Sequence, residues 1–376
     1  MSMKNVFCDL AVEPINGLFP YQPGKPIDEL QRELGLDNIV KLASNENPLG
    51  PSDVVKEAIQ SAIKDVALYP DGNGFYLKKA LSEKLGVTTD MITLGNGSND
   101  VLDLIARVFL SQGREAVYSQ YAFVVYAIAT QSVGATARVA KASSINSTAT
   151  YGHDLSAMLA LVNDKTSVVF IANPNNPTGT WLEPLELEAF IKQIPKHVIV
   201  VLDEAYCEYL EQQITVNSID FLQTYPNLII TRTFSKAYGL AGLRVGYAVS
   251  HPDVADLLNR VRQPFNVNSL ALVAAEAALK DDDYINRSRV LNTQGLQQLT
   301  KGFEQLGLSY IPSVGNFVSV NVGDNAADIY TRLLQKGVIV RPIAAYKMPS
   351  FLRVSVGLAD ENATCLAAFK AVLADV

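Results

Sequence analysis

The amino-acid sequence predicts an α/β fold, with a large domain built on a mainly parallel sheet and a smaller α+β domain beside it. Two apolar runs without alternation, residues 167–172 and 198–203, are typical of strands that are covered on both faces. Helical patterns separate such runs along the chain, as they do in parallel sheets. After about residue 310 the pattern changes to alternating strands, which favours a second unit of different architecture.

The expected elements follow in chain order. Periodicity and turn residues predict strands at 39–42, 92–95, 116–118, 167–172, 198–203, 228–233 and 245–249, and helices at about 53–65, 75–86, 97–110 and 252–310. Residues 317–321 and 352–356 alternate and predict half-exposed strands, accompanied by helices at 326–336 and 360–374. We therefore expect a large domain over 38–280, and an N-terminal arm (1–37) with a small C-terminal domain (281–376).

Composition excludes several classes of protein. Hydrophobic residues make up 48% and charged residues 18% of the 376 residues, which excludes a disordered chain. The net charge of −7 and the absence of a basic run argue against nucleic-acid binding. Three separated cysteines and only three histidines predict neither a disulfide framework nor a metal site, and favour a reducing compartment, the cytoplasm.

Two segments bear on membranes and targeting. Residues 1–14 lack the pattern of a signal peptide. Residues 116–137 carry no charge, but their serine, threonine, glutamine and glycine content favours a buried strand, loop and helix over a membrane span. We expect no membrane partner.

The segment with the clearest chemical signal is 233–244 (TFSKAYGLAGLR). A lone Lys236 follows a buried strand, and burying an ammonium group is costly. A surface lysine at a strand end would explain the pattern without chemistry. A lysine with a depressed pKa, whose amine attacks a carbonyl to form a Schiff base, explains it as well and predicts a site.

Two further segments end buried strands with polar residues. Residues 173–179 (NPNNPTG) and 203–206 (DEAY) each follow an apolar run, and ligands bind at the carboxyl edge of α/β sheets. Each segment alone is explained by a turn or a helix cap. Together they give an amide, an acid, a lysine and an arginine at successive strand ends.

This order resembles the fold type I pyridoxal-phosphate enzymes, the aspartate aminotransferase superfamily, over nearly the whole chain. The resemblance implies a seven-stranded sheet. Closer matches to the histidinol-phosphate aminotransferase family are found at residues 44–50 (SNENPLG), 69–72 (YPDG), 119–123 (SQYAF), 337–341 (GVIVR) and 352–357 (LRVSVG). That family implies a homodimer that makes imidazole-acetol phosphate and L-glutamate from L-histidinol phosphate and 2-oxoglutarate, in L-histidine biosynthesis.

The resemblance implies roles toward pyridoxal 5'-phosphate. Lys236 would hold the cofactor and shuttle the proton, and Asp203 would pair with the ring nitrogen. Asn176 and Tyr206 would bond the ring O3′, and Phe123, with Tyr121 as second choice, would stack on the ring. The cofactor phosphate would be bound by Ser98, Asn99, Thr233, Ser235, Arg244 and, from the second subunit, Tyr69.

The resemblance also implies a substrate end. Arg353 would grip the α-carboxylate of glutamate, and Arg341 with Tyr21 would meet the substrate phosphate. Asn45 lies in the loop expected to face the substrate. The chain departs from the commonest family pattern at Asp100, where relatives carry a longer glutamate after the phosphate-binding residues.

Other functions are compatible with parts of this pattern. An aromatic amino-acid aminotransferase would share every cofactor residue, and a threonine-phosphate decarboxylase would also need a phosphate-binding arginine. A ligand-binding module of a transcription regulator would need an added DNA-binding domain, and no basic helix-turn-helix pattern is visible. Of these, transamination of histidinol phosphate is the leading hypothesis.

Overall fold

The computed structural model describes the chain apart from residues 1–6, 9, 21–23, 144–149, 211–216 and 375–376. Its largest sheet has seven strands in the order β2-β8-β7-β6-β5-β3-β4. These strands are β2 (Ile92–Gly95), β3 (Glu115–Ser119), β4 (Thr136–Ala140), β5 (Thr166–Ala172), β6 (Ile199–Asp203), β7 (Leu228–Thr233) and β8 (Gly246–Ser250). In this sheet β8 alone runs in the opposite direction to the other six strands. The predicted seven-stranded, mainly parallel sheet is therefore confirmed.

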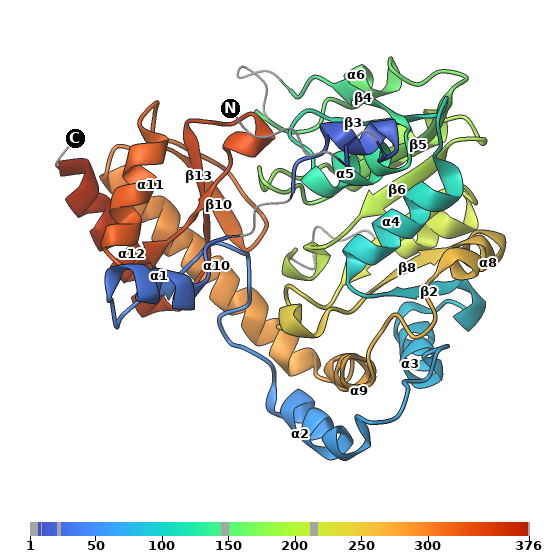
Figure 1. The fold of residues 1–376 in the computed structure, drawn as a ribbon, viewed down its shortest axis with the longest axis horizontal. Coiled ribbons are helices and arrows are strands. Elements are labelled where there is room, and N and C mark those ends of the chain that lie inside the picture. The colour runs from blue at the N-terminus through green and yellow to red at the C-terminus, as the bar shows by residue number, and fades with distance from the viewer. Residues whose placement is uncertain (1–6, 9, 21–23, 144–149, 211–216, 375–376) are drawn as a thin grey trace.

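The large sheet is buried on both faces, which explains the non-alternating apolar runs. Val169 and Val200 pack into the core on one face, whereas Val168 and Phe170 pack into the core on the other. Burying one such side chain contributes about 1.5–3 kcal/mol. The first face is covered by α3 (Phe75–Leu85), α6 (Leu155–Leu159), α7 (Pro184–Gln193) and α9 (Ser269–Ala278), and the second by α4 (Ser98–Phe109), α5 (Val124–Ser132) and α8 (Pro252–Val261) (Figure 1).

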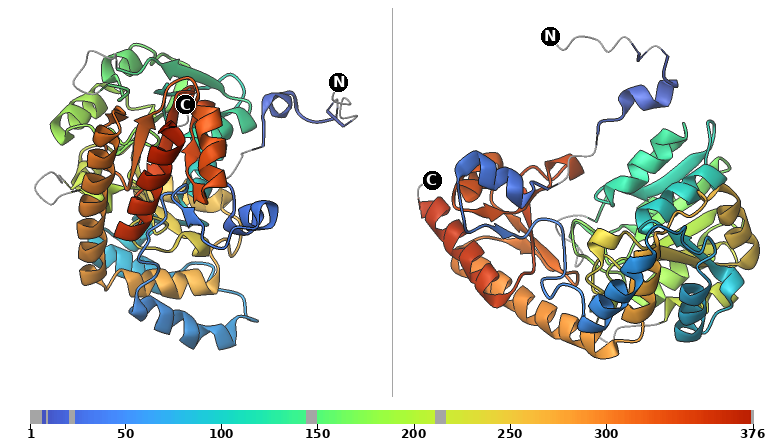
Figure 2. Two further views of the ribbon diagram at one scale, coloured as in Figure 1. Left: turned by 90° about the vertical axis from the view of Figure 1, so that its left-hand side faces the viewer. Right: turned by 60° about the horizontal axis from the view of Figure 1, so that its bottom comes forward.

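A second, smaller unit, here called the C-terminal unit, is formed mainly by the C-terminal part of the chain. Four antiparallel strands lie in the order β12 (Arg341–Pro342), β13 (Phe351–Ser355), β10 (Phe317–Asn321) and β9 (Tyr310–Ile311). Helices α10 (Asp282–Gln305), α11 (Ala326–Gln335) and α12 (Ala359–Ala374) supply its core. Figure 2 shows this unit and the large sheet side by side. The long α10 connects them, because Tyr284 and Ile285 near its start pack into the core of the large unit and Leu299 and Phe303 pack into that of the C-terminal unit.

The N-terminal segment joins both units. Helix α1 (Ile27–Leu34) packs with the C-terminal unit, and β1 (Val40–Lys41) pairs in parallel with β11 (Val338–Ile339). Helix α2 (Asp53–Ala62) then packs against α9 of the large unit. The predicted domain limits at residues 37 and 280 stay a prediction.

The C-terminal strands differ from the expectation of half-exposed strands. Every residue of β13 is buried, because its polar members face the interior of the molecule rather than solvent. Arg353 bonds to Asn176, and Ser355 bonds to Asn45 of the N-terminal segment. Ser319 of β10 donates a hydrogen bond to the carbonyl of Pro177 at 2.6 Å. The alternation of polar and apolar residues in β13 therefore reflects a polar strand face that is buried in the molecule and does not meet solvent.

Other expectations about segments can be compared directly. Residues 116–137 form most of β3 and the whole of α5, as the expected strand, loop and helix. The segment also contains the start of β4, a strand that the sequence did not predict. No helix among the described residues is long and apolar enough to cross a membrane. The single helical region expected at 252–310 is instead three helices. Helix α8 ends where Arg262 takes an extended backbone with ψ 134°, and Asp281, with ψ 70°, separates α9 from α10.

Candidate active site

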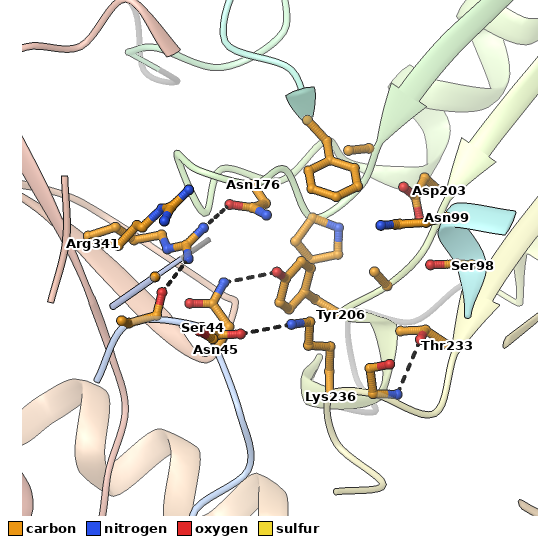
Figure 3. Close-up of a pocket in the computed structure, with 18 of the residues that line it drawn as sticks. Ser44, Asn45, Ser98, Asn99, Asn176, Asp203, Tyr206, Thr233, Lys236 and Arg341 are labelled. Atoms are coloured by element: carbon orange, nitrogen blue, oxygen red, sulfur yellow. Dashed lines mark hydrogen bonds between the residues drawn. The ribbon is translucent and has the colours of Figure 1, made fainter. Parts of the chain in front are cut away.

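A cavity of about 190 Å³ lies where β5, β6 and β7 end, facing β13 of the C-terminal unit. Figure 3 shows Ser98, Asn99 and Asp203 on one side of it and Arg341 on the other, with Lys236 and Tyr206 between them. The predicted site residues that line this cavity are Asn45, Ser98, Asn99, Phe123, Asn176, Asp203, Tyr206, Thr233, Ser235, Lys236, Arg244, Arg341 and Arg353.

Two predicted site residues that the structure describes do not line this cavity. Tyr69 is 84% exposed and does not line the cavity of its own chain. Tyr121, the second choice for ring stacking, packs against Tyr151 with ring centroids 5.6 Å apart, whereas Phe123 lines the cavity. Tyr21 falls outside the described residues.

Lys236 follows β7 and reaches back toward the N-terminal loop. Its Nζ donates a hydrogen bond to the carbonyl oxygen of Ser44 at 3.0 Å and lies 5.9 Å from the centre of the Tyr206 ring. Burial, and next the positive charge of Arg353, lower the pKa of Lys236 to about 7. An amine with this pKa is largely neutral just above pH 7, which a nucleophile or a proton acceptor requires.

Asp203 ends β6, and its carboxylate is held from two directions. Tyr126 donates to Oδ2 at 2.8 Å, and Thr231 donates to Oδ1 at 3.2 Å. Burial raises the pKa of Asp203 to about 6, while both hydrogen bonds work in the opposite direction. A fixed carboxylate of this kind suits a cationic partner in the cavity.

A cradle of donors lies on the same side of the cavity as Asp203, where α4 begins. Gly97 precedes the helix with φ +79°, and a Cβ there would collide with the guanidinium of Arg244. A Cβ on Gly246 would lie 2.5 Å from the backbone nitrogen of Ser98. Arg244 also donates to Ser235 Oγ at 3.4 Å. The glycines thus let a helix N-terminus, hydroxyls and a guanidinium approach each other closely, as anion sites require.

Polar side chains from three distant segments meet at the remaining wall. Arg353 donates from Nη1 to Asn176 Oδ1 at 2.6 Å and from Nη2 to the carbonyl of Ala43 at 2.8 Å. Asn45 donates to the Tyr206 hydroxyl at 2.9 Å. Burial raises the pKa of Tyr206 to about 12, so this hydroxyl remains neutral at pH 7.

Sequence reasoning missed some contributors. Tyr126 was not assigned a role, although it lies three residues after Phe123, one turn along the same helical segment. Ser44 contributes only a backbone carbonyl, and Ser355 bonds both the backbone and the side chain of Asn45. The phenol group of Tyr126, so close to Phe123, could have suggested a role in the site. A backbone acceptor such as the carbonyl of Ser44 leaves no signal in the sequence.

The donor set fits pyridoxal 5'-phosphate. A phosphate matches the cradle at Gly97 and Arg244, a pyridine nitrogen matches the buried carboxylate of Asp203, and an aldehyde matches the amine of Lys236. All three groups line one cavity. These residues therefore have the chemistry that the cofactor requires.

Comparison with known proteins gives the family. Residues 37–369 match the family "Aminotransferase class I and II", and the chain belongs to it. Histidinol-phosphate aminotransferase 2 of Pseudomonas fluorescens is 57% identical over 99% of this chain and 100% of that protein. The protein of the same name from Pseudomonas aeruginosa is 57% identical over 98% and 99%.

Solved structures agree with this assignment. The crystal structure of histidinol-phosphate aminotransferase from Sinorhizobium meliloti in complex with pyridoxal-5'-phosphate has a TM-score of 0.88 and 30% identity, covering 97% of this chain and 98% of that one. A double mutant of the aspartate aminotransferase of Thermus thermophilus, at 22% identity and a TM-score of 0.82 over 96% of this chain and 99% of that one, shares the fold. The chain is an aminotransferase of fold type I, and the predicted resemblance to histidinol-phosphate aminotransferases is confirmed.

Proposed function

We propose that the protein is a pyridoxal-phosphate-dependent transaminase that converts L-histidinol phosphate and 2-oxoglutarate to imidazole-acetol phosphate and L-glutamate, a step of L-histidine biosynthesis. The observation that carries the proposal is a single cavity with a low-pKa lysine, a buried aspartate, a phosphate cradle and two arginines. The relatives with 57% identity over nearly the whole chain bear the name of this activity.

The cofactor would lie between the cradle and the Asp203 carboxylate. Ser98, Asn99, Thr233, Ser235 and Arg244 would bind its phosphate, Asn176 and Tyr206 its ring oxygen O3′, and Phe123 one face of its ring. When bound, pyridoxal phosphate supplies an electron sink for the negative charge that develops on the substrate α-carbon. Asp203, held by Tyr126, would keep the ring nitrogen protonated through its negative charge.

Lys236 would perform two tasks. Its neutral amine would hold the cofactor covalently between reactions, and after release it would take the proton from the substrate α-carbon at Nζ. The carbonyl of Ser44, 3.0 Å from Nζ, would orient the amine. Asn45 would keep the Tyr206 hydroxyl in place beside it.

Both substrates carry an anion close to the reacting carbon. 2-Oxoglutarate, like the glutamate formed from it, has a carboxylate on that carbon, and histidinol phosphate has a phosphate ester one carbon away. Arg353 would bind the carboxylate through its planar fork, and Arg341 would bind the phosphate. Two arginines at one wall suit an enzyme that accepts both in turn. Tyr21 would assist Arg341.

We also propose that the active protein is a homodimer in which Tyr69 reaches the cofactor phosphate of the other subunit. Tyr69 is exposed and stacks on the exposed Phe265, and Leu68, Phe75 and Tyr76 of the same stretch of chain are exposed as well. Exposed apolar side chains in contact with one another favour a surface that binds another protein. The reaction would take place in the cytoplasm, which fits the free thiols of Cys8, Cys207 and Cys365.

Absorbance spectroscopy tests the proposed function. The purified protein, loaded with pyridoxal phosphate, is titrated separately with L-histidinol phosphate and L-phenylalanine without keto acid. Loss of the lysine-bound cofactor band at far lower concentrations of histidinol phosphate supports the proposal. A response to phenylalanine alone would favour an aromatic aminotransferase, and release of CO₂ from threonine phosphate would favour the decarboxylase. Lys236→Ala serves as the control, because it cannot form the band.

A further inference from the structure

The turn that carries Tyr69 is held by the segment between α8 and α9. The rings of Tyr69 and Phe265 stack with centroids 4.8 Å apart and an interplanar angle of 27°. Arg262, directly after α8, donates from Nη2 to the carbonyl of Gly72 at 2.8 Å. One residue of the turn is thus held by stacking and another by a hydrogen bond with a charged donor.

The same segment is braced internally. Phe265 has φ +58°, a left-handed conformation that is strained for an aromatic residue and persists only where the surroundings enforce it. Arg262 donates from Nη1 to Asn266 Oδ1 at 2.7 Å and from Nε to Asn259 Oδ1 at 3.0 Å. The bond to Asn266 spans Phe265, and the bond to Asn259 anchors Arg262 to α8. Together they restrain the segment that carries the ring on which Tyr69 stacks.

The hydrogen bonds continue to the phosphate cradle. Asn266 donates from Nδ2 to Asp100 Oδ2 at 2.7 Å, and the same oxygen accepts the backbone N–H of Asn96 at 2.8 Å. Asn96 immediately precedes Gly97, and Asp100 lies in the first turn of α4, next to Asn99. The shorter carboxylate at position 100 is therefore part of a continuous chain of bonds from the cradle to Gly72.

We propose that Arg262, Asn266 and Asp100 form a positioning network, which holds Tyr69 at a fixed position relative to the phosphate cradle of its own subunit. In the dimer, this fixed position places Tyr69 at the cofactor phosphate of the other subunit. The inference rests on the proposed dimer. None of the three side chains lines the cavity, so each acts through the elements it holds. In the dimer, the network thus links the position of each phosphate cradle to the position of the Tyr69 that serves the other site.

A double-mutant cycle on the holoenzyme tests this role. The dissociation constant of pyridoxal phosphate is measured for Tyr69→Phe, Arg262→Gln and the double variant. Each single change is expected to weaken binding roughly tenfold, the effect of one lost hydrogen bond to a charged group. The double variant is expected to bind no more weakly than Tyr69→Phe, because Arg262 acts through Tyr69. Arg260→Gln, which replaces an exposed arginine in the last turn of α8, is the matched control and is expected to bind normally.

Hybrid dimers place the effect in one subunit. When one subunit carries Lys236→Ala, only the other holds its cofactor covalently. Arg262→Gln in the Lys236→Ala subunit should weaken retention of that covalently held cofactor, whereas Arg262→Gln in the subunit that holds it should have little effect. Asn266→Ala, which cuts the network at its centre, replaces Arg262→Gln if the latter does not fold.

The outcomes separate the network from the proposed function. The network role would be overturned if the double variant bound the cofactor more weakly than Tyr69→Phe by the full factor seen in Arg262→Gln. It would also be overturned if Arg262→Gln weakened cofactor binding only in the subunit that carries it. Normal cofactor binding in Arg262→Gln while Tyr69→Phe binds weakly would overturn it as well. A monomeric wild-type protein, or one without a lysine-bound cofactor band, would overturn the proposed function and the network together.

Discussion

Arg353 of β13 donates a hydrogen bond of 2.6 Å to the side-chain oxygen of Asn176, which lies in the loop after β5. The bond joins the C-terminal unit to the large sheet across the cavity. Because the amide oxygen is occupied by Arg353, the amide nitrogen of Asn176 is the group left to donate toward the cavity. Arg353 would therefore both bind the substrate anion and orient Asn176, a proposed cofactor ligand.

Replacing Arg353 by lysine should affect glutamate most. Lysine keeps the charge but loses the fork and the bond that orients Asn176, so kcat/KM for glutamate should fall by about 10- to 100-fold. Steady-state kinetics with glutamate as amino donor provide the measurement. The cofactor spectrum should also shift, since Asn176 would lose its fixed orientation. Unchanged kinetics for glutamate would contradict the carboxylate-binding role.

Tyr126→Phe should impair catalysis more than substrate binding. The change keeps the ring, which stacks on Phe170 at 4.8 Å, and removes only the hydroxyl that donates to Asp203. Losing a donor raises the pKa of the carboxyl, so less of its negative charge supports the ring nitrogen. We expect kcat to fall about tenfold, the effect of one hydrogen bond to a charged group, with KM nearly unchanged. A change in KM alone would argue against this positioning role.

The attachment of the cofactor should depend on pH through Lys236. Its pKa of about 7 lies below the ordinary lysine value, so the neutral, reactive amine predominates above pH 7 and is lost as the pH falls below it. The rate at which the apoprotein forms the lysine-bound cofactor band should therefore rise from pH 6 to 8 and then level off. Stopped-flow absorbance measures this rate. A rate that still climbs tenfold per unit above pH 9 would indicate an unshifted lysine.

Much of this site could be predicted from sequence because its residues follow strands in the chain. Asp203 and Lys236 come at or just after the ends of buried apolar runs, and parallel strands bring such ends to one edge. The partners that tune these residues could not be predicted in the same way. Tyr126 and Asp203 are 77 positions apart, and Asn45 and Ser355 are 310 apart, so no local pattern relates them.

The fold shows a similar division. Continuous apolar runs predicted the strands of the large sheet, since both faces are covered by helices. Alternation in 352–356 predicted a half-exposed strand, but the polar face of β13 is buried against the large unit, where Arg353 meets Asn176. Alternation distinguishes polar from apolar faces, and only tertiary packing decides whether the polar face meets solvent or a buried site.

Arg341→Gln should discriminate between substrates. If Arg341 binds the substrate phosphate, the variant should lose roughly 10- to 100-fold in kcat/KM for histidinol phosphate, as expected for a lost charge-assisted contact. Phenylalanine carries no phosphate, so the kcat/KM measured with phenylalanine should hardly change. Parallel assays of both amino donors give the ratio directly. An equal loss for both donors would refute the assigned role.

Gly97→Ala should loosen the cofactor through the phosphate cradle. The new Cβ would meet the guanidinium of Arg244, and the residue would be forced to keep φ near +79°. Gly113→Ala is the matched control, because Gly113 has φ +86° and a Cβ added there would meet no atom within 4 Å, so it shares the strain without the collision. Both variants should lower the stability of the apoprotein by about 1–3 kcal/mol, the cost of a strained backbone. Only Gly97→Ala should raise the dissociation constant of pyridoxal phosphate, which equilibrium dialysis measures, and equal affinities in the two variants would show that the cradle does not hold the phosphate.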